Sequence, residues 1–95
     1  MLTATSVPSL WRLARVEYDD VRKRPVLLYP EGAVLLNETG AAILKLVDGQ
    51  RSVGDIARAL SEQYNGAGSA DSTEILNDVT AYLSTLAARE LIRDQ

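Results

Sequence analysis

The sequence predicts a single α+β domain of winged helix-turn-helix type, in which three short β-strands precede three α-helices. Two patterns along the 95 residues favour this class. Before Asn37, β-branched and aromatic residues alternate with polar ones, and after it apolar residues recur at helical spacing. Because Phe is absent and Trp occurs once, the core is expected to consist of Leu, Val, Ile and Ala. We expect a flexible N-terminal arm over residues 1–11 and the domain over residues 12–95.

The strands are expected over residues 12–18, 26–29 and 33–36. Trp11, at the end of the arm, either covers one end of the core or has a functional role, and the first alternative is favoured. Pro30-Glu31-Gly32 separates the second and third strands. Proline presets the backbone for the first turn position, and Gly32 is expected to take the left-handed conformation that closes a bulged hairpin.

The helices are expected over residues 38–47, 53–64 and 72–89. Asn37 is a good N-cap for the first helix, and Gly49 is expected in the left-handed conformation that ends it. Ser52 and Asp55 form a near capping box at the start of the second helix, whose apolar residues have the clearest helical spacing. A glycine-containing loop over residues 65–70 follows. Residues 91–92 either extend the third helix or form a short terminal strand.

The composition excludes several kinds of chemistry. Cysteine and histidine are both absent, which removes disulfides, thiolate nucleophiles, Cys/His zinc sites and Ser-His or Cys-His pairs. Asp19-Asp20 is expected to be a pair of solvated turn charges. We therefore expect no catalytic residue, no metal and no cofactor. No apolar run approaches the ~20 residues of a membrane span, and no secretory signal is recognisable, so a cytoplasmic protein without membrane contact is expected.

The charge distribution argues against nucleic-acid binding. Residues 1–37 carry a net charge of +1 and residues 38–95 a net charge of −4. A recognition helix needs Lys or Arg to meet phosphates, whereas the third predicted helix has Asp78 among its acidic residues and only Arg89 at its far end. The winged-helix pattern still leaves a DNA-binding regulator as the alternative from a different functional class, although the charges argue against it. The basic run at residues 22–24 either is a solvated turn or attracts acidic residues of a partner.

The third strand is the most informative element. Ala33-Val34-Leu35-Leu36 has no charge and no proline. In a simple meander this strand is an edge, and proteins normally protect exposed edges with charge or proline. An unprotected apolar edge either is covered by the protein itself or receives another strand. The same edge makes strand exchange or a homodimer a further expectation.

The third helix has an apolar arc wider than ordinary core packing requires. The arc spans roughly 140°, whereas ~100° suffices for a core-facing stripe. The surplus flank, which contains Leu76, Thr80 and Leu83, either lines a groove beside the third strand or packs on a second neighbour.

Several short motifs together resemble the protein D family of pyrroloquinoline quinone (PQQ) biosynthesis. They are Leu27-Leu28-Tyr29-Pro30-Glu31-Gly32, Leu36-Asn37-Glu38-Thr39-Gly40, Ile43-Leu44, Asp48-Gly49, and Ser52-Val53 through Ile56 to Leu60. The resemblance covers residues 12–92. Any one motif alone would be weak, but the combination is specific.

The resemblance implies a recognition element for ribosomally synthesised and post-translationally modified peptides (RiPPs). In this family a precursor peptide adds as a strand to the third β-strand, lies against the third helix and is presented to a radical S-adenosylmethionine (SAM) enzyme. The family member is not an enzyme and holds no cofactor. The implied peptide-binding residues are Ala33, Val34, Leu35, Leu36, Leu76, Asp78, Tyr82 and Leu83. A recognition element for a different modified peptide is the nearest alternative.

Overall fold

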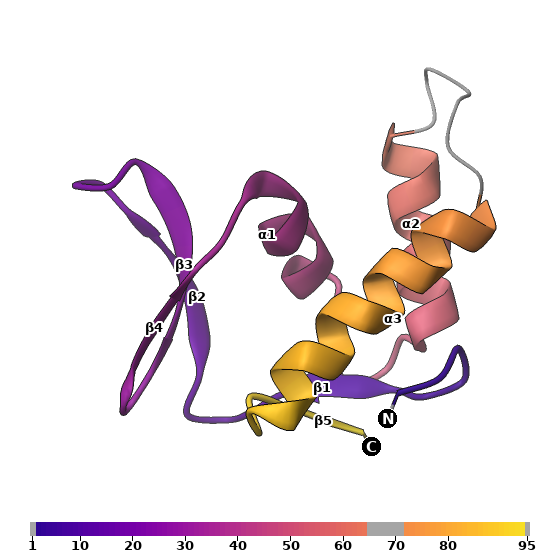
Figure 1. Ribbon diagram of the computed structural model, residues 1–95, viewed down its shortest axis with the longest axis horizontal. Helices are drawn as coiled ribbons and strands as arrows, with labels where there is room; N and C mark the ends of the chain where they lie inside the picture. The colour runs from indigo at the N-terminus through magenta and orange to yellow at the C-terminus, as the bar shows by residue number, and fades with distance from the viewer. Residues whose placement is uncertain (1, 65–71, 95) are drawn as a thin grey trace.

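The computed structural model describes residues 2–64 and 72–94, which form five strands and three helices. The strands are β1 (Pro8–Leu10), β2 (Arg15–Asp19), β3 (Arg24–Tyr29), β4 (Gly32–Leu35) and β5 (Ile92–Asp94), and the helices are α1 (Glu38–Lys45), α2 (Val53–Tyr64) and α3 (Ser72–Ala88). The α+β class is confirmed, but the described chain has two more strands than the three predicted (Figure 1). The loop predicted over residues 65–70 lies outside the described residues.

The three predicted strands form an antiparallel sheet in the order β2-β3-β4. The β3–β4 turn is tighter than predicted, because Tyr29 pairs directly with Gly32 across a two-residue connection. The predicted bulge is wrong, since Gly32 is not among the described residues with positive φ. A Cβ at this position would lie 3.4 Å from the Tyr29 hydroxyl, an ordinary van der Waals distance. Gly49, with φ of 78°, has the predicted left-handed conformation.

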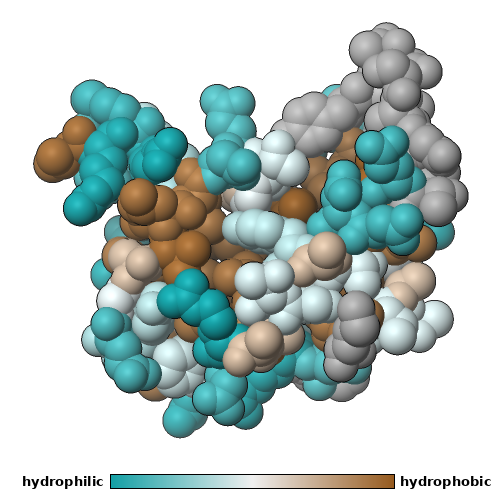
Figure 2. All heavy atoms as spheres, in the orientation of Figure 1, coloured by the Kyte–Doolittle hydropathy of each residue, from teal (hydrophilic) through white to brown (hydrophobic). Residues whose placement is uncertain are grey.

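The core lies between this sheet and the helices and has the predicted aliphatic composition. Leu27 of β3, Val53 and Ile56 of α2, and Leu83 of α3 are completely buried. The helices α2 and α3 pack against each other, and α1 lies between them and the sheet (Figure 1). Figure 2 shows that apolar side chains also reach the surface between the sheet and the helical part of the molecule.

Residues 2–10 are packed against the domain, which corrects the expectation of a flexible arm lying apart from it. β1 pairs antiparallel with β5, so residues 91–92 lead into a terminal strand rather than extending α3. The Leu2 side chain is only 5% exposed and belongs to the core. Trp11 packs against the core as predicted, and its backbone N–H donates to the carbonyl of Leu91 at 2.8 Å.

The N-terminal segment also completes the start of α2. The N–H of Val53 donates to the carbonyl of Ser6 at 2.8 Å, and the N–H of Gly54 donates to the carbonyl of Ala4 at 2.9 Å. The first amides of a helix have no partner within the helix, so these carbonyls satisfy groups that would otherwise need side-chain caps or water. The segment is therefore part of the helix cap as well as of the core.

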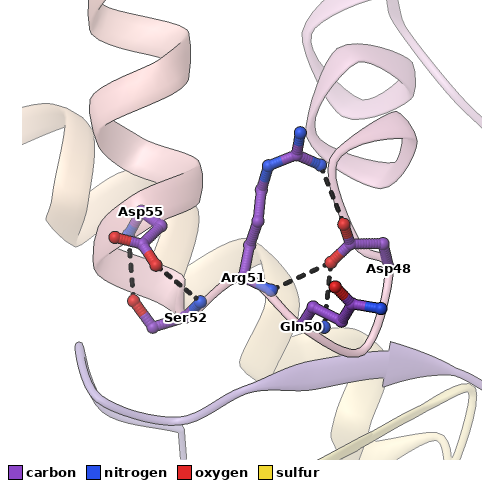
Figure 3. Close-up of polar contacts among 5 residues, drawn as sticks. All are labelled: Asp48, Gln50, Arg51, Ser52 and Asp55. Carbon is purple, nitrogen blue, oxygen red and sulfur yellow. Dashed lines mark hydrogen bonds and ion pairs between the residues drawn. The ribbon is translucent and has the colours of Figure 1, made fainter.

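The connection between α1 and α2 is held by local polar contacts (Figure 3). The Asp48 carboxylate accepts from the backbone N–H groups of Gln50 and Arg51, each at 2.9 Å, and from the Arg51 guanidinium at 3.0 Å. These bonds, led by the one from the Arg51 backbone, hold the pKa of Asp48 below its ordinary value. Ser52 and Asp55 exchange hydrogen bonds, which confirms the predicted capping box. The connection is therefore held by its own polar side chains, and the N–H of Gly49 also donates to the carbonyl of Pro8 at 3.1 Å.

Candidate functional site

The strand β4 is an open edge of the three-stranded sheet, as predicted. Among the described residues, it pairs with β3 alone. The N–H of Leu36, just beyond β4, donates to the carbonyl of Pro25 in β3 at 2.9 Å. Backbone groups of successive residues in an antiparallel ladder point to alternate sides. Val34 therefore faces β3, whereas Ala33 and Leu35 direct their N–H and C=O groups away from the sheet.

The side chains of the same segment divide between the two faces of the sheet. Leu36 is 2% exposed and belongs to the core, and Val34 packs against the core from a half-buried position. Ala33 is exposed and Leu35 is 50% exposed, both on the outer face. The edge thus combines outward backbone groups with apolar side chains, and it carries none of the charges or prolines that usually protect an edge.

Two contacts set the position of α3 beside β4. At one end, the Arg89 guanidinium donates to the Tyr29 hydroxyl at 3.0 Å, and Tyr29 pairs with Gly32 at the start of β4. At the other end, the Tyr82 hydroxyl lies against Gly40 of α1, close to the end of β4. These contacts bring the stretch from Tyr82 to Arg89 to the side of the sheet where β4 lies. We use the name β4–α3 valley for this side of the molecule, defined by Tyr29, Ala33–Leu35, Tyr82 and Arg89.

The four predicted α3 residues do not share one face of the helix. Leu83 is completely buried and supports α3 from the core rather than lining a surface. Tyr82 is half-buried beside the valley, and Asp78, one turn away on the same flank, is exposed. Leu76 is half-buried on the core but is six residues from Tyr82, which at ~100° per residue places it about 120° around the helix. Tyr82 and Asp78 therefore mark the flank of α3 that faces β4.

Arg89 and Tyr29 belong to the valley, but neither is among the binding residues predicted from the sequence. The Arg89 guanidinium carbon lies 5.9 Å from the centre of the Tyr29 ring, so a cation–π contact adds to their hydrogen bond. Arg89 follows Tyr82 by seven residues, a spacing that returns to the same helix face. This spacing could have indicated from the sequence that Arg89 lies on the face of Tyr82. Burial raises the pKa of Tyr82 above its ordinary value of 10.0, so its hydroxyl is a neutral hydrogen-bonding group at pH 7.

Replacing Gly40 with alanine is expected to disturb the Tyr82 end of the valley. The new methyl group would lie 2.5 Å from the Tyr82 hydroxyl oxygen and 3.0 Å from its ring carbon, so the ring must move. We expect the overpacking to cost roughly 1–3 kcal/mol, partly offset by the better helix propensity of alanine. Urea denaturation measures the change. The double variant G40A/Y82F lacks the clashing oxygen and should recover much of the loss, and full stability of G40A alone would contradict the packing.

Two further features are absent from the described residues. In residues 2–64 and 72–94, no group of three or more His, Cys, Asp and Glu side chains is placed to hold a metal ion. Within the same ranges, no helix is long and apolar enough to span a membrane.

Comparison with known proteins places the chain in one family. The model of the family "Coenzyme PQQ synthesis protein D (PqqD)" matches residues 25–92. A PqqA binding protein of Klebsiella pneumoniae (strain 342) is 39% identical over 88 residues, which cover 93% of this chain and 90% of that protein. A PqqA binding protein of Stutzerimonas stutzeri is 39% identical over 85 residues, with coverage of 90% and 87%.

Solved structures give the same result for the fold. The solution NMR structure of the PqqD part of Methylobacterium extorquens PqqCD, described as a functional and stand-alone RiPP recognition element, matches with a TM-score of 0.82 and 35% identity, covering 98% of this chain and 95% of that one. TbiB1, solved with the TbiA(β) leader peptide, has a TM-score of 0.72 at 23% identity and coverage of 90% and 94%, which shows a shared fold. Since the family model covers more than half of the sequence, this chain belongs to the coenzyme PQQ synthesis protein D family.

Proposed function

We propose that this protein binds the PQQ precursor peptide, PqqA, by β-strand addition to β4. The observation that carries the proposal is the open edge at Ala33 and Leu35, whose backbone groups point away from the sheet beside α3. Its relatives at 39% identity are PqqA binding proteins, and a structural relative is a RiPP recognition element. Both findings support a peptide as the occupant of this edge.

The valley offers the peptide two kinds of interaction. The N–H and C=O groups of Ala33 and Leu35 can form four backbone hydrogen bonds, each contributing roughly 0.5–1.5 kcal/mol. Side chains of an added strand alternate between faces. Those on one face would meet Val34, Tyr29 and Tyr82, and those on the other would continue the outer surface beside Leu35. The backbone thus supplies affinity, and the alternate side chains supply selectivity.

The proposed role is that of an adaptor and not of an enzyme. The sequence contains neither cysteine nor histidine, which supports a role without catalysis or a cofactor. In this role the protein presents PqqA to a radical SAM enzyme in the cytoplasm. Recognition of a different modified peptide is the alternative. Comparing the affinity for PqqA with the affinity for that peptide decides between them. Duplex DNA is not an expected ligand, and a low-salt gel shift tests this directly.

A homodimer through β4 would use the same backbone groups as the peptide. We therefore expect that any dimer formed through this edge dissociates when PqqA is added. Sedimentation at micromolar concentration, with and without the peptide, measures this competition. A dimer that persists at saturating peptide would contradict the use of β4 for self-association.

Titration of the isotopically labelled protein with PqqA tests the proposed function. Saturable shifts are expected for the backbone amides of residues 33–36 and for α3 around Tyr82 and Arg89. A scrambled peptide of the same composition is the control. If PqqA binds while these amides remain unchanged, the peptide lies elsewhere, and if it does not bind at all, the proposed function is wrong.

A further inference from the structure

The three-stranded sheet has a second open edge at β2. In the described chain, β2 pairs only with β3. Because the Pro25 carbonyl of β3 faces β4, its neighbours Arg24 and Val26 face β2, where they pair with Asp19 and Glu17. The alternate residues of β2, Val16 and Tyr18, therefore direct their backbone groups away from the sheet. Both edges of the sheet present outward donors and acceptors.

A helix also lies beside this second edge. A cleft of about 560 Å³ lies between β2 and α1, lined by Val16, Glu17, Tyr18, Pro25, Glu38, Ala41, Ala42, Lys45, Leu46 and Gln63. A second cleft of about 610 Å³ is lined by Tyr18, Arg22, Lys23, Arg24, Pro25, Leu36, Asn37 and Glu38. The two clefts share Tyr18, Pro25 and Glu38, so they adjoin. We name their combined lining the β2–α1 groove.

The groove is positively charged on a protein of net negative charge. Its lining has four basic side chains, from Arg22, Lys23, Arg24 and Lys45, against two carboxylates, a net charge of +2. The whole chain carries −3. The Arg22 side chain is paired with Asp19 at 2.9 Å. For Lys23, Arg24 and Lys45, no ion pair with another described residue is present. These three cations are available to an acidic ligand.

The β2–β3 hairpin beside the groove exposes apolar surface. The hairpin projects away from the rest of the molecule, and Figure 2 shows a notch between it and the body (Figures 1 and 2). Tyr18 is 60% exposed and Val21, next to the basic run, is 91% exposed. Large apolar side chains beside cations and unpaired strand groups form a surface suited to a protein partner.

The helix α1 separates this groove from the β4–α3 valley. Gly40 of α1 lies against Tyr82 on the valley side, while Ala41, Ala42 and Lys45 line the groove on the other side. The two open edges are on opposite sides of β3, about 10 Å apart at ~4.8 Å per strand. A strand added at β4 would therefore leave the groove free.

We propose that the β2–α1 groove docks an extended, acidic segment of the protein that receives the peptide. The open strand edge selects an extended segment, and the +2 charge selects acidic side chains. The proposal rests on the proposed function, because it assumes that β4 is occupied by PqqA. The sheet then holds the peptide at one edge and the receiving enzyme at the other.

Charge reversal tests the electrostatic part with the purified radical SAM enzyme as the probe. The variant R24E/K45E reverses two unpaired cations of the groove, and the control R12E/R58E has the same net charge but changes exposed residues outside both clefts. We expect the enzyme to bind peptide-loaded R24E/K45E at least about tenfold more weakly than wild type, and R12E/R58E within about twofold of it. Equal losses in both variants, or no loss in R24E/K45E, would overturn the proposal.

A proline substitution tests the strand edge. The N–H of Tyr18 points outward, so Y18P removes a donor from the open edge without removing a bond to β3. The variant Y18A removes the same side chain and keeps the N–H. We expect enzyme binding to be roughly fivefold weaker for Y18P than for Y18A, with thermal melts confirming that both are folded. Equal binding by the two folded variants would exclude strand addition at β2.

Peptide binding is measured in parallel on every variant. All four variants are expected to bind PqqA as wild type does, since the β4–α3 valley is unchanged. Loss of PqqA binding in R24E/K45E would mean that the groove holds the peptide instead of the enzyme. If wild type self-associates and R24E/K45E does not, the groove holds a second copy of this chain. If wild type does not bind PqqA, the proposed function fails, while enzyme binding to the unloaded variants still tests the groove.

Discussion

Replacing Ala33 with proline is expected to weaken PqqA binding at least about tenfold while the protein stays folded. The N–H of Ala33 points away from β3, so proline removes a donor offered to the peptide and places its ring in the path of an added strand. Proline is tolerated where a strand's N–H faces solvent. Isothermal titration calorimetry measures the affinity, and thermal melting reports the fold.

Two further variants define what an A33P result means. Ala33→Gly keeps the N–H and should bind PqqA within about twofold of wild type. Val34→Pro instead removes an N–H that faces β3, so it should destabilise the sheet itself. Affinity of A33P equal to that of wild type would exclude peptide addition along this strand. Comparing A33P with V34P thus distinguishes the loss of an N–H that faces the peptide from the loss of an N–H that faces β3.

Deletion of residues 2–7 is expected to destabilise the protein severely. The deletion removes the buried Leu2 side chain, worth about 1.5–3 kcal/mol, and the carbonyls of Ala4 and Ser6 that cap α2, each worth about 1 kcal/mol. A loss of roughly 3–5 kcal/mol is a large share of the stability of a small domain. At about 4–8 °C per kcal/mol, the melting temperature should fall by more than about 12 °C.

The substitution Leu2→Ala in the full chain is the control for this deletion. It keeps the carbonyls of Ala4 and Ser6 and removes only apolar contact, so its loss should be about 2–3 kcal/mol and smaller than that of the deletion. If the deletion variant melts within a few degrees of wild type, the segment does not contribute to the core as the structure indicates. Circular dichroism melts are sufficient for the comparison.

Local patterns predicted most of the fold because their causes lie within a few residues. Asn37 caps α1 by accepting from the N–H of Gly40 at 2.7 Å, and Ser52 and Asp55 cap α2 as their spacing predicts. The chain order of the three central strands also placed β4 at an edge. These features depend on neighbours in sequence, which is why propensity and spacing were sufficient.

Apart from the bulge predicted at Gly32, the errors concern contacts between distant parts of the chain. β1 was missed because its partner β5 lies at the other end of the sequence and three residues give no alternation to detect. Leu83 was assigned to a groove because the width of an apolar arc does not show which neighbour each flank packs on. The Arg89–Tyr29 contact joins residues 60 apart, and no local pattern predicts such a pair. Tertiary packing decided all three.

The pairing of β1 with β5 has a consequence for fusion to other polypeptides. The first and last described residues lie in the same region of the molecule, where the N–H of Val7 donates to the Asp94 carboxylate at 3.1 Å (Figure 1). A linker at either terminus would therefore leave the domain from the same place. A protein fused before or after this domain would be held at a similar distance from β4, whichever terminus carries the linker.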